Sequence, residues 1–532
     1  MPAKSSSRHV VLQPSQGVVN VTRLVRLISM QSVMTLMLLV SSPLFAKEAD
    51  EFRQSTADHG EFEQLKQAFE TGPDVTRACL GCHTNAARQI HQSTHWTWEF
   101  KNPETGQLLG KRHVVNNFCL AATPNIESCS SCHIGYGWEE EEFDFASEEN
   151  VDCLVCHDTT GTYSRLALRD PEKKKPNLKK IAQNVGKTSR QTCGTCHFQG
   201  GGGKGVKHGD MDPTLVHPDI FVDVHMDADG MNFSCSTCHV SDAHEISGSR
   251  YAPTAVDQEK VAVAGRDGRT TCRSCHSGEP HEKDERLNHH ARTIACQTCH
   301  IPKLSRGDYP SKMWWDWSEA GKRDESGQQY SVLDEAGLEV YNSKKGDFTW
   351  ERDNIPEYRW FNGTILYTLP GEEIDPDSIV KVNRLLGGPD EGNSRIWPVK
   401  VMRGKQPYDL EYNTLLTPQT VGKEGYWKTL DWNQALTLGS EAMNKRFSGA
   451  YGFVETEMDW LASHMVPPAD QSLGCADCHS TQGRLAGLGG IYIPGTGSAA
   501  WLDRIGLLIV LATLLGILGH GAFRLFLRLR RR

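Results

Sequence analysis

Cys153-Leu-Val-Cys156-His157 decides how this chain of 532 residues must fold, because its pattern, Cys-x-x-Cys-His, occurs eight times. Two cysteines three positions apart, followed at once by a histidine, are the signature of c-type haem attachment. The thiols form thioethers to the haem, and the histidine becomes the proximal ligand of the iron. The eight attachment motifs are Cys79/Cys82/His83, Cys129/Cys132/His133, Cys153/Cys156/His157, Cys193/Cys196/His197, Cys235/Cys238/His239, Cys272/Cys275/His276, Cys296/Cys299/His300 and Cys475/Cys478/His479.

The motifs use 16 of the 17 cysteines. A zinc site or a disulfide framework would not require a histidine after every second cysteine. We therefore expect eight covalently bound haem c groups, each with its iron. Hydrophobic residues make up only 38% of the chain, so the porphyrins are expected to supply much of the apolar volume. The predicted fold is mainly α with extensive loops, a multihaem cytochrome c fold wrapped around eight haems, with one C-terminal transmembrane helix.

The two ends of the chain differ from its body. Arg23 and Arg26 precede an apolar run that ends in a small-residue pattern at Ala46, which is typical of a secretory signal; a retained N-terminal anchor is the alternative. The predicted organisation is a signal peptide at 1–46, a periplasmic octahaem domain at 47–486, a Gly/Ser-rich linker at 487–500, a transmembrane helix at 501–526 and a basic cytoplasmic tail at 527–532.

The apolar run Ile505–Phe523 carries no formally charged residue. At about 1.5 Å rise per residue, its 19 residues just cross a bilayer core of about 30 Å. Five arginines follow it, at 524, 528 and 530–532, and the positive-inside rule keeps such a tail in the cytoplasm. We expect a body on the periplasmic side of a bacterial inner membrane, held by a single C-terminal span.

The charge of the body limits its partners. Four of the 57 Lys and Arg residues lie in 1–46 and six in 501–532, whereas only Asp503 of the 66 acidic residues lies there, so the body carries a net charge of −18. Nucleic acid is therefore excluded as an expected partner. An anionic substrate would need a local basic pocket.

The motifs are unevenly spaced. Seven lie between Cys79 and His300, and the eighth follows a long gap. The haem-poor stretch 301–474 contains nine of the 13 tryptophans, which either stack on haem edges or form an ordinary aromatic core. A helix is expected over Gln434–Phe447.

Distal ligands decide whether an iron carries electrons or performs chemistry. A haem with two histidine ligands has no open position, so an enzyme needs one iron with a different or replaceable sixth ligand. Twelve histidines remain after the proximal and terminal ones are set aside. The best distal candidates lie on short helices or beside motifs, and they are His95, His113, His225, His244, His281, His290 and His464.

The fourth motif continues into a glycine-rich segment, Gly200-Gly-Gly-Gly-Lys204-Gly-Val-Lys207-His208-Gly-Asp210. It lacks the Gly-Lys-Ser/Thr order of a P-loop. A neutral lysine amine could ligate haem iron, and burial lowers the lysine pKa in that direction; a solvated surface loop is the alternative. Cys119 is the one cysteine outside the motifs, and it is either a functional thiol or a small buried residue.

Taken together, the eight motifs with the last far downstream, the segment Asn150-Val-Asp-Cys-Leu-Val-Cys-His157-Asp-Thr-Thr-Gly161 and the Lys207-His-Gly-Asp210 loop resemble the octahaem tetrathionate reductase family. The resemblance covers about residues 75–480. It implies seven haems with two histidine ligands and one active haem with a distal lysine and a nearby cysteine. Lys207 matches the lysine best, with Lys204 second, Cys119 matches the cysteine, and the second motif is the expected active haem. The C-terminal anchor departs from the family's soluble members.

The expected activity is reduction of tetrathionate to thiosulfate, and of nitrite or hydroxylamine as further substrates. The catalytic candidates are Lys207, Cys119, Lys204 and His208. The expected partners are a small anionic sulfur or nitrogen oxyanion and a quinol-linked or cytochrome electron donor of the membrane. One alternative is a non-catalytic conduit in which His208 or His217 completes an eighth bis-histidine haem. Another is a hydroxylamine oxidoreductase-like enzyme, which would need a cross-linking tyrosine such as Tyr451 or Tyr492.

Overall fold

The computed structural model describes residues 57–116, 121–138, 142–170, 172–198, 205–206, 209–257, 261–263, 266–268, 270–307, 309–494 and 500–531. The expected signal peptide therefore lies outside the described residues. The compact unit that carries the motifs begins at Asp58.

Each attachment motif forms or adjoins a short helical turn, because residues three apart on a helix lie on the same face and can present two thiols together. The helices that carry or flank the motifs are α3 (Gly72–Leu80), α4 (Ala86–His91), α5 (Thr94–Thr97), α6 (Ile126–Cys129), η4 (Ser130–Cys132), α7 (Leu154–His157), α8 (Arg165–Arg169), α9 (Leu178–Gln183), α10 (Arg190–His197), α11 (Cys235–Cys238), η6 (Cys272–Ser274), α12 (Glu285–His290), α13 (Cys296–His300) and α16 (Cys475–Cys478). The remaining 3-10 turns are η1 (His59–Glu61), η2 (Glu63–Leu65), η3 (Thr123–Asn125), η5 (Pro213–Val216), η7 (Trp317–Glu319) and η8 (Ala469–Gln471).

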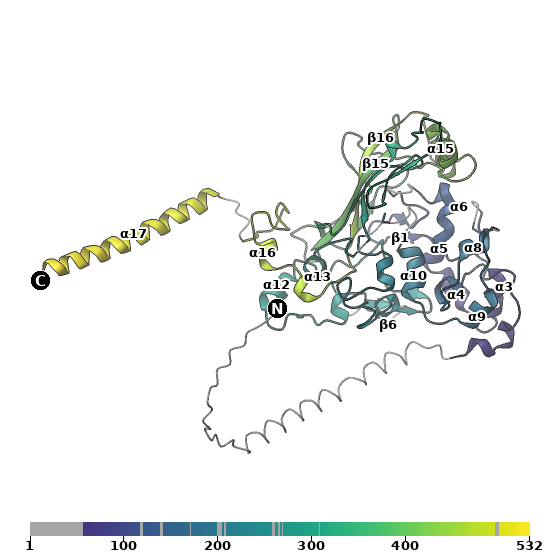
Figure 1. The fold of residues 1–532 in the computed structure, drawn as a ribbon, viewed down its shortest axis with the longest axis horizontal. Coiled ribbons are helices and arrows are strands. Elements are labelled where there is room, and N and C mark those ends of the chain that lie inside the picture. The colour runs from purple at the N-terminus through teal and green to yellow at the C-terminus, as the bar shows by residue number, and fades with distance from the viewer. Residues whose placement is uncertain are drawn as a thin grey trace, which may run out of the picture. The chain divides into compact units, whose positions relative to one another are not determined.

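The haem-poor stretch folds as an eight-stranded mixed sheet. Its order is β13-β16-β15-β7-β10-β9-β8, and β11 also pairs with β15. Figure 1 shows β15 and β16 as its long paired strands. The strands are β7 (Ser311–Asp316), β8 (Ser331–Leu333), β9 (Glu339–Asn342), β10 (Gly346–Glu351), β11 (Glu357–Phe361), β13 (Val380–Lys381), β15 (Arg395–Asp409) and β16 (Tyr451–Leu461). Four two-stranded sheets accompany it, formed by β1 (Phe100–Lys101) with β2 (Leu108–Leu109), β3 (Ser241–Asp242) with β4 (Glu245–Ile246), β5 (Val261–Val263) with β6 (Arg266–Gly268), and β12 (Ile365–Tyr367) with β14 (Asn383–Leu385).

The expectation of a mainly α fold is not confirmed, because this sheet supplies the largest apolar core. Trp315, Trp317, Trp397 and Trp460 are all buried in that core, so the tryptophans of the stretch pack mainly against the sheet. Helix α15 (Trp432–Ala442) begins two residues before the expected start and ends five residues before the expected end at Phe447. Asp431 caps it by accepting a hydrogen bond from the Gln434 N–H. A further short helix, α14 (Tyr426–Thr429), precedes it.

The C-terminal helix α17 (Ala500–Arg530) is 31 residues long. Residues Arg504–Arg530 of this helix are long and apolar enough to cross a membrane, and none of their most apolar window is buried against the protein. In Figure 1, α17 is the single long helix at the C-terminal end.

Candidate functional site

The 16 cysteines of the attachment motifs are all free of disulfide bonds, so each thiol is available for a thioether. Cys82 and Cys275 differ from the second cysteines of the other six motifs in their placement. Helix α3 ends at Leu80 and η6 ends at Ser274, so these two thiols lie just beyond their helical turns, whereas the other six lie within theirs.

Cys82, Cys238, Cys275 and Cys475 are exposed, and the other 12 thiols of the motifs are partly buried.

Seven proximal histidines each face a second histidine from elsewhere in the chain. Their ring centroids lie 6.0–6.4 Å apart. Two metal–nitrogen bonds of about 2.0–2.1 Å, plus about 1.1 Å from each nitrogen to its ring centre, give about 6.2–6.4 Å, so each pair fits one iron between two imidazoles. The pairs, proximal residue first, are His83–His59, His157–His244, His197–His95, His239–His464, His276–His225, His300–His281 and His479–His290.

Six of the seven distal candidates from the sequence take part in these pairs, and His113 does not. Its Nε2 lies 3.0 Å from Glu99 Oε1, on the segment beside β1. His59 takes the seventh place, opposite His83. Sequence reasoning passed over His59 because it lies 20 positions before the first motif, and only its membership of the twelve remaining histidines pointed to it.

Backbone carbonyls orient several proximal rings. Nδ1 of His157, His239 and His479 lies 2.8–2.9 Å from the carbonyl oxygens of Gly186, Ser247 and Pro494. A carbonyl can only accept, so each Nδ1 carries the proton and Nε2 is left as the metal-binding nitrogen. Burial also lowers the pKa of His239 and His300, which favours the neutral imidazole that a metal requires.

His133, in the second motif, is placed differently. Its backbone N–H donates to the Ser130 carbonyl, whereas in five other motifs the backbone N–H of the histidine donates to the carbonyl of the first cysteine. Its ring is fully buried among Trp96, Trp98 and Trp138. Among the described residues, no histidine ring faces it.

The ring nitrogens of His133 also exchange roles relative to those of His157, His239 and His479. The Gly135 N–H donates to its Nδ1 at 3.1 Å, and its Nε2 lies 2.6 Å from the Trp96 carbonyl oxygen, so here Nε2 carries the proton. Burial lowers the pKa of His133 to about 4, which keeps the ring neutral. Nε2 must leave the Trp96 carbonyl before it can bind iron. The second motif is therefore unlike the other seven in both backbone and ring.

Three comparisons with known proteins bear on this arrangement. A family model described as bacterial cytochrome c matches residues 312–482. A solved octahaem cytochrome c from Shewanella oneidensis is 42% identical with a TM-score of 0.72, and the match covers 81% of this chain and 95% of that one. The chain belongs to the octahaem cytochrome c family. An uncharacterized protein of Archaeoglobus fulgidus is 24% identical over 37% of this chain and 82% of its own length.

In this octahaem cytochrome, a buried ion pair supports the segment that follows His133. Arg165 Nε donates to Asp152 Oδ2 at 2.9 Å, and Arg165 Nη1 donates to the His133 carbonyl. Asp152 also accepts hydrogen bonds from the hydroxyls of Tyr136 and Tyr163, both at 2.8 Å. The pKa of Tyr136 is raised well above its usual value by burial and by the Asp152 charge, so both hydroxyls stay protonated as donors.

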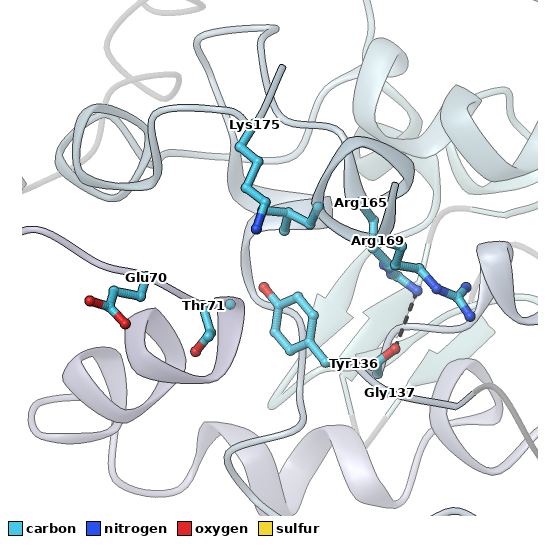
Figure 2. A pocket seen from close by; sticks show the side chains of 10 residues that line it. Glu70, Thr71, Tyr136, Gly137, Arg165, Arg169 and Lys175 are labelled. Atoms are coloured by element: carbon cyan, nitrogen blue, oxygen red, sulfur yellow. Dashed lines mark hydrogen bonds between the residues drawn. The ribbon is translucent and has the colours of Figure 1, made fainter. Parts of the chain in front are cut away.

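A cavity of about 170 Å³ adjoins this support. Figure 2 shows Arg165, Arg169 and Lys175 around it, with Glu70 on the opposite side. Arg165 Nη2 is buried and has no partner among the described residues. Guanidinium groups bind carboxylates in forked pairs, so these cations suit an acidic group such as a haem propionate, and the cofactor that the family carries fits the donor set.

The predicted catalytic residues Cys119, Lys204, Lys207 and His208 lie outside the described residues, but Gly205 and Gly209 of the glycine-rich segment are described. The Lys312 N–H donates to the Gly205 carbonyl at 2.7 Å, and the Ser305 N–H donates to the Gly209 carbonyl at 2.6 Å. These bonds fix Gly205 to β7 and Gly209 to the segment before it.

His217 and the two tyrosines named for the alternative functions lie within the described residues, whereas His208 does not. Of the two candidate cross-linking tyrosines, Tyr451 packs against the sheet core, and Tyr492 is 83% exposed. His217, a candidate eighth distal ligand, is exposed as well.

The last residue of the loop contacts a paired histidine. Asp210 is buried, and its Oδ2 accepts from the backbone N–H of Ser463 and His464 and lies 3.3 Å from His464 Nδ1. Burial acts to lower the pKa of His464, but the hydrogen bond and charge of Asp210 outweigh it, so the pKa is raised. A carboxylate behind a ligating histidine increases its basicity. Asp210 therefore links the loop to the fifth motif's pair.

Proposed function

We propose that this octahaem cytochrome is a reductase that carries eight haems, seven of them electron carriers with two histidine ligands and one catalytic. The observation that carries the proposal is the contrast between seven facing histidine pairs and His133, which faces none among the described residues. A bis-histidine iron has no site for a substrate, so the second motif is the place where chemistry can occur.

The substrate that we propose is tetrathionate, on the strength of the sequence resemblance to the octahaem tetrathionate reductases. Two electrons break its central S–S bond, and the two halves leave as two thiosulfate dianions, so no proton is needed. The haem supplies the electrons one at a time. We assign Lys207 as the replaceable distal ligand, Lys204 and His208 as groups that offset the substrate's charge, and Cys119 as a thiol that contacts a substrate sulfur. Nitrite and hydroxylamine are further candidate substrates.

We also propose that α17 anchors the protein in a bacterial inner membrane, with the haem domain on the periplasmic side. The length and apolar character of residues 504–530 support a span, and the arginines at its end support a cytoplasmic tail. The signal peptide expected at 1–46 would export the haem domain to the periplasm, which is the side that the positive-inside rule also gives it. The electron donor is quinol-linked or another cytochrome.

The decisive experiment replaces Lys207 with methionine. The proposal expects Lys207→Met to lose at least 90% of tetrathionate turnover, while the histidine-ligated haems are still reduced at the original rate. Methionine is one atom shorter than lysine and can also ligate iron, but unlike lysine it cannot be protonated to an ammonium ion when it leaves. Turnover is measured with a reduced viologen, and haem reduction by visible absorbance.

Lys423→Met, on an exposed lysine, is the matched control, and it should retain full activity. If Lys207→Met turns over tetrathionate as well as the control does, the catalytic role of the loop is wrong and the molecule is an electron conduit.

A further inference from the structure

The eighth attachment motif is directly joined to the segment that leads to α17. The Pro494 carbonyl oxygen lies 2.9 Å from Nδ1 of His479, the proximal histidine of that motif. Helix α17 begins at Ala500. Six residue steps of at most about 3.3–3.6 Å separate the two points, so the chain itself keeps the start of α17 within about 22 Å of Pro494.

The segment before Pro494 is packed onto the protein and does not lengthen this tether. Leu485 is buried against Tyr358 and Ile396, and Leu488 and Ile491 pack against the same cluster. The Trp360 indole N–H donates to the Gly489 carbonyl at 3.0 Å. The chain between this packed segment and α17 therefore spans only the six residue steps from Pro494 to Ala500.

The eighth motif contacts the seventh. The Leu473 N–H donates to the Cys299 carbonyl at 3.0 Å, and Arg484 donates to the Pro302 carbonyl at 3.0 Å.

Contacts between motifs continue from there to the second motif. The thiol of Cys272 contacts that of Cys296, which joins motifs six and seven. The Val224 N–H donates to the Val466 carbonyl at 2.9 Å, beside the distal histidines of motifs six and five. Thiol contacts then join motifs five and four, and motifs four and two, through the pairs Cys235–Cys193 and Cys132–Cys196. The eighth motif is one end of this path, and the second motif is the other. Motifs one and three form a branch, because the Cys153 thiol contacts that of Cys79 and Cys156 interacts with Cys193 of the fourth motif.

From the short tether and the terminal place on this path, we infer that electrons enter this protein at the eighth motif, from a redox protein held in the same membrane. The inference rests on the proposed membrane anchor and on the proposed catalytic role of the second motif. We take the donor to be a protein because α17 is one helix with exposed side chains, and a single helix encloses no cavity for a quinol.

The test lengthens the tether without touching the haem sites. A flexible Gly/Ser insert of 24 residues between 497 and 498 makes the link from Pro494 to Ala500 about five times longer. Effective concentration falls roughly as the −3/2 power of tether length, so quinol-driven haem reduction in native membrane vesicles should slow about tenfold. Reduction by a soluble viologen should not change. The matched control carries the same insert after Gly337, an exposed turn whose Cβ position has no neighbour within 4 Å, and it should behave as the parent chain does.

A second variant identifies the haem concerned. His290→Met alters the ligation and raises the potential of the eighth haem, which then retains electrons delivered there. The other haems should lag in quinol-driven reduction and should not lag with viologen. An unchanged quinol-driven rate in the long-tether chain, equal lags with both donors, or rapid reduction by quinol in liposomes that hold this chain alone would overturn the inference. Tetrathionate turnover with viologen is scored separately, so a wrong substrate does not affect these outcomes.

Discussion

Asp210 is placed to tune the reduction potential of one haem. Its carboxylate is 3.3 Å from Nδ1 of His464, and a carboxylate partner makes a histidine ligand a stronger donor, which favours the oxidised iron. We expect Asp210→Asn to raise the reduction potential of one haem and to leave the others unchanged, as measured by a spectroscopic redox titration. Asp212→Asn is the control, because Asp212 is buried two residues away and accepts its hydrogen bonds from Thr214. Equal titrations of both variants would rule out this role.

Lys400 gives a pH dependence of stability with a defined sign. The side chain is buried in β15, and burial lowers its pKa from 10.5 to about 7. Between those values the unfolded chain binds a proton that the folded chain lacks, so this residue makes stability rise with pH, by up to about 1.4 kcal/mol per pH unit. Lys400→Met should lose that rise between pH 7 and 10 in thermal melting curves. A parallel dependence in the variant and in the parent would contradict it.

At the scale of single residues, the haem attachment sites can be predicted from the sequence because the motif occupies five consecutive positions. The distal ligands are harder to predict, since His464 lies 225 positions from His239 and only the fold brings them together. His113 and His59 illustrate this: both lie near a short helix or strand, yet a carboxylate at Glu99 holds one and the first motif faces the other. No local pattern separates the two cases.

Gly404 is the point where the sheet depends on a missing side chain. A Cβ atom there would lie 2.3 Å from the Trp315 carbonyl oxygen, where β15 runs parallel to β7. We expect Gly404→Ala to destabilise the protein by about 1–3 kcal/mol, because the strands must separate to admit it. Thermal melting measures the loss. Gly392→Ala, where a Cβ meets nothing within 4 Å, should melt with the parent protein, and equal melting of both variants would count against the close approach.

The large sheet is the element that the sequence did not predict. Strand β15 is buried on both faces over most of its length, so it lacks the alternation of apolar and polar residues that marks a half-exposed strand. Charged and polar side chains such as Lys400 and Gln406 are also buried in it. By contrast, α15 follows a capping residue, Asp431, and the helical spacing of its residues predicted a helix from the sequence.

For the whole molecule, seven facing pairs and one different site predict a specific spectrum. We expect EPR and near-infrared magnetic circular dichroism of the oxidised haem domain to show seven low-spin bis-histidine haems and one haem of another class. Histidine–lysine ligation and a high-spin iron are both distinguishable from the bis-histidine class. The Lys207→Met substitution should change only the signal of the haem that is not bis-histidine. Eight bis-histidine signals would remove the proposed active site.

The seven histidine pairs also make each iron a cross-link between distant parts of the chain. Residues 239 and 464, or 95 and 197, become the ends of closed loops once an iron joins them. Closing a loop of about 100 residues removes unfolded-state entropy worth about 4–5 kcal/mol in the chain-entropy picture. Cofactor loading is therefore expected to add to the stability of the folded chain. A chain without haem would lack these cross-links and would be more accessible to proteases. Cells short of haem should therefore accumulate fragments of it rather than an intact apoprotein.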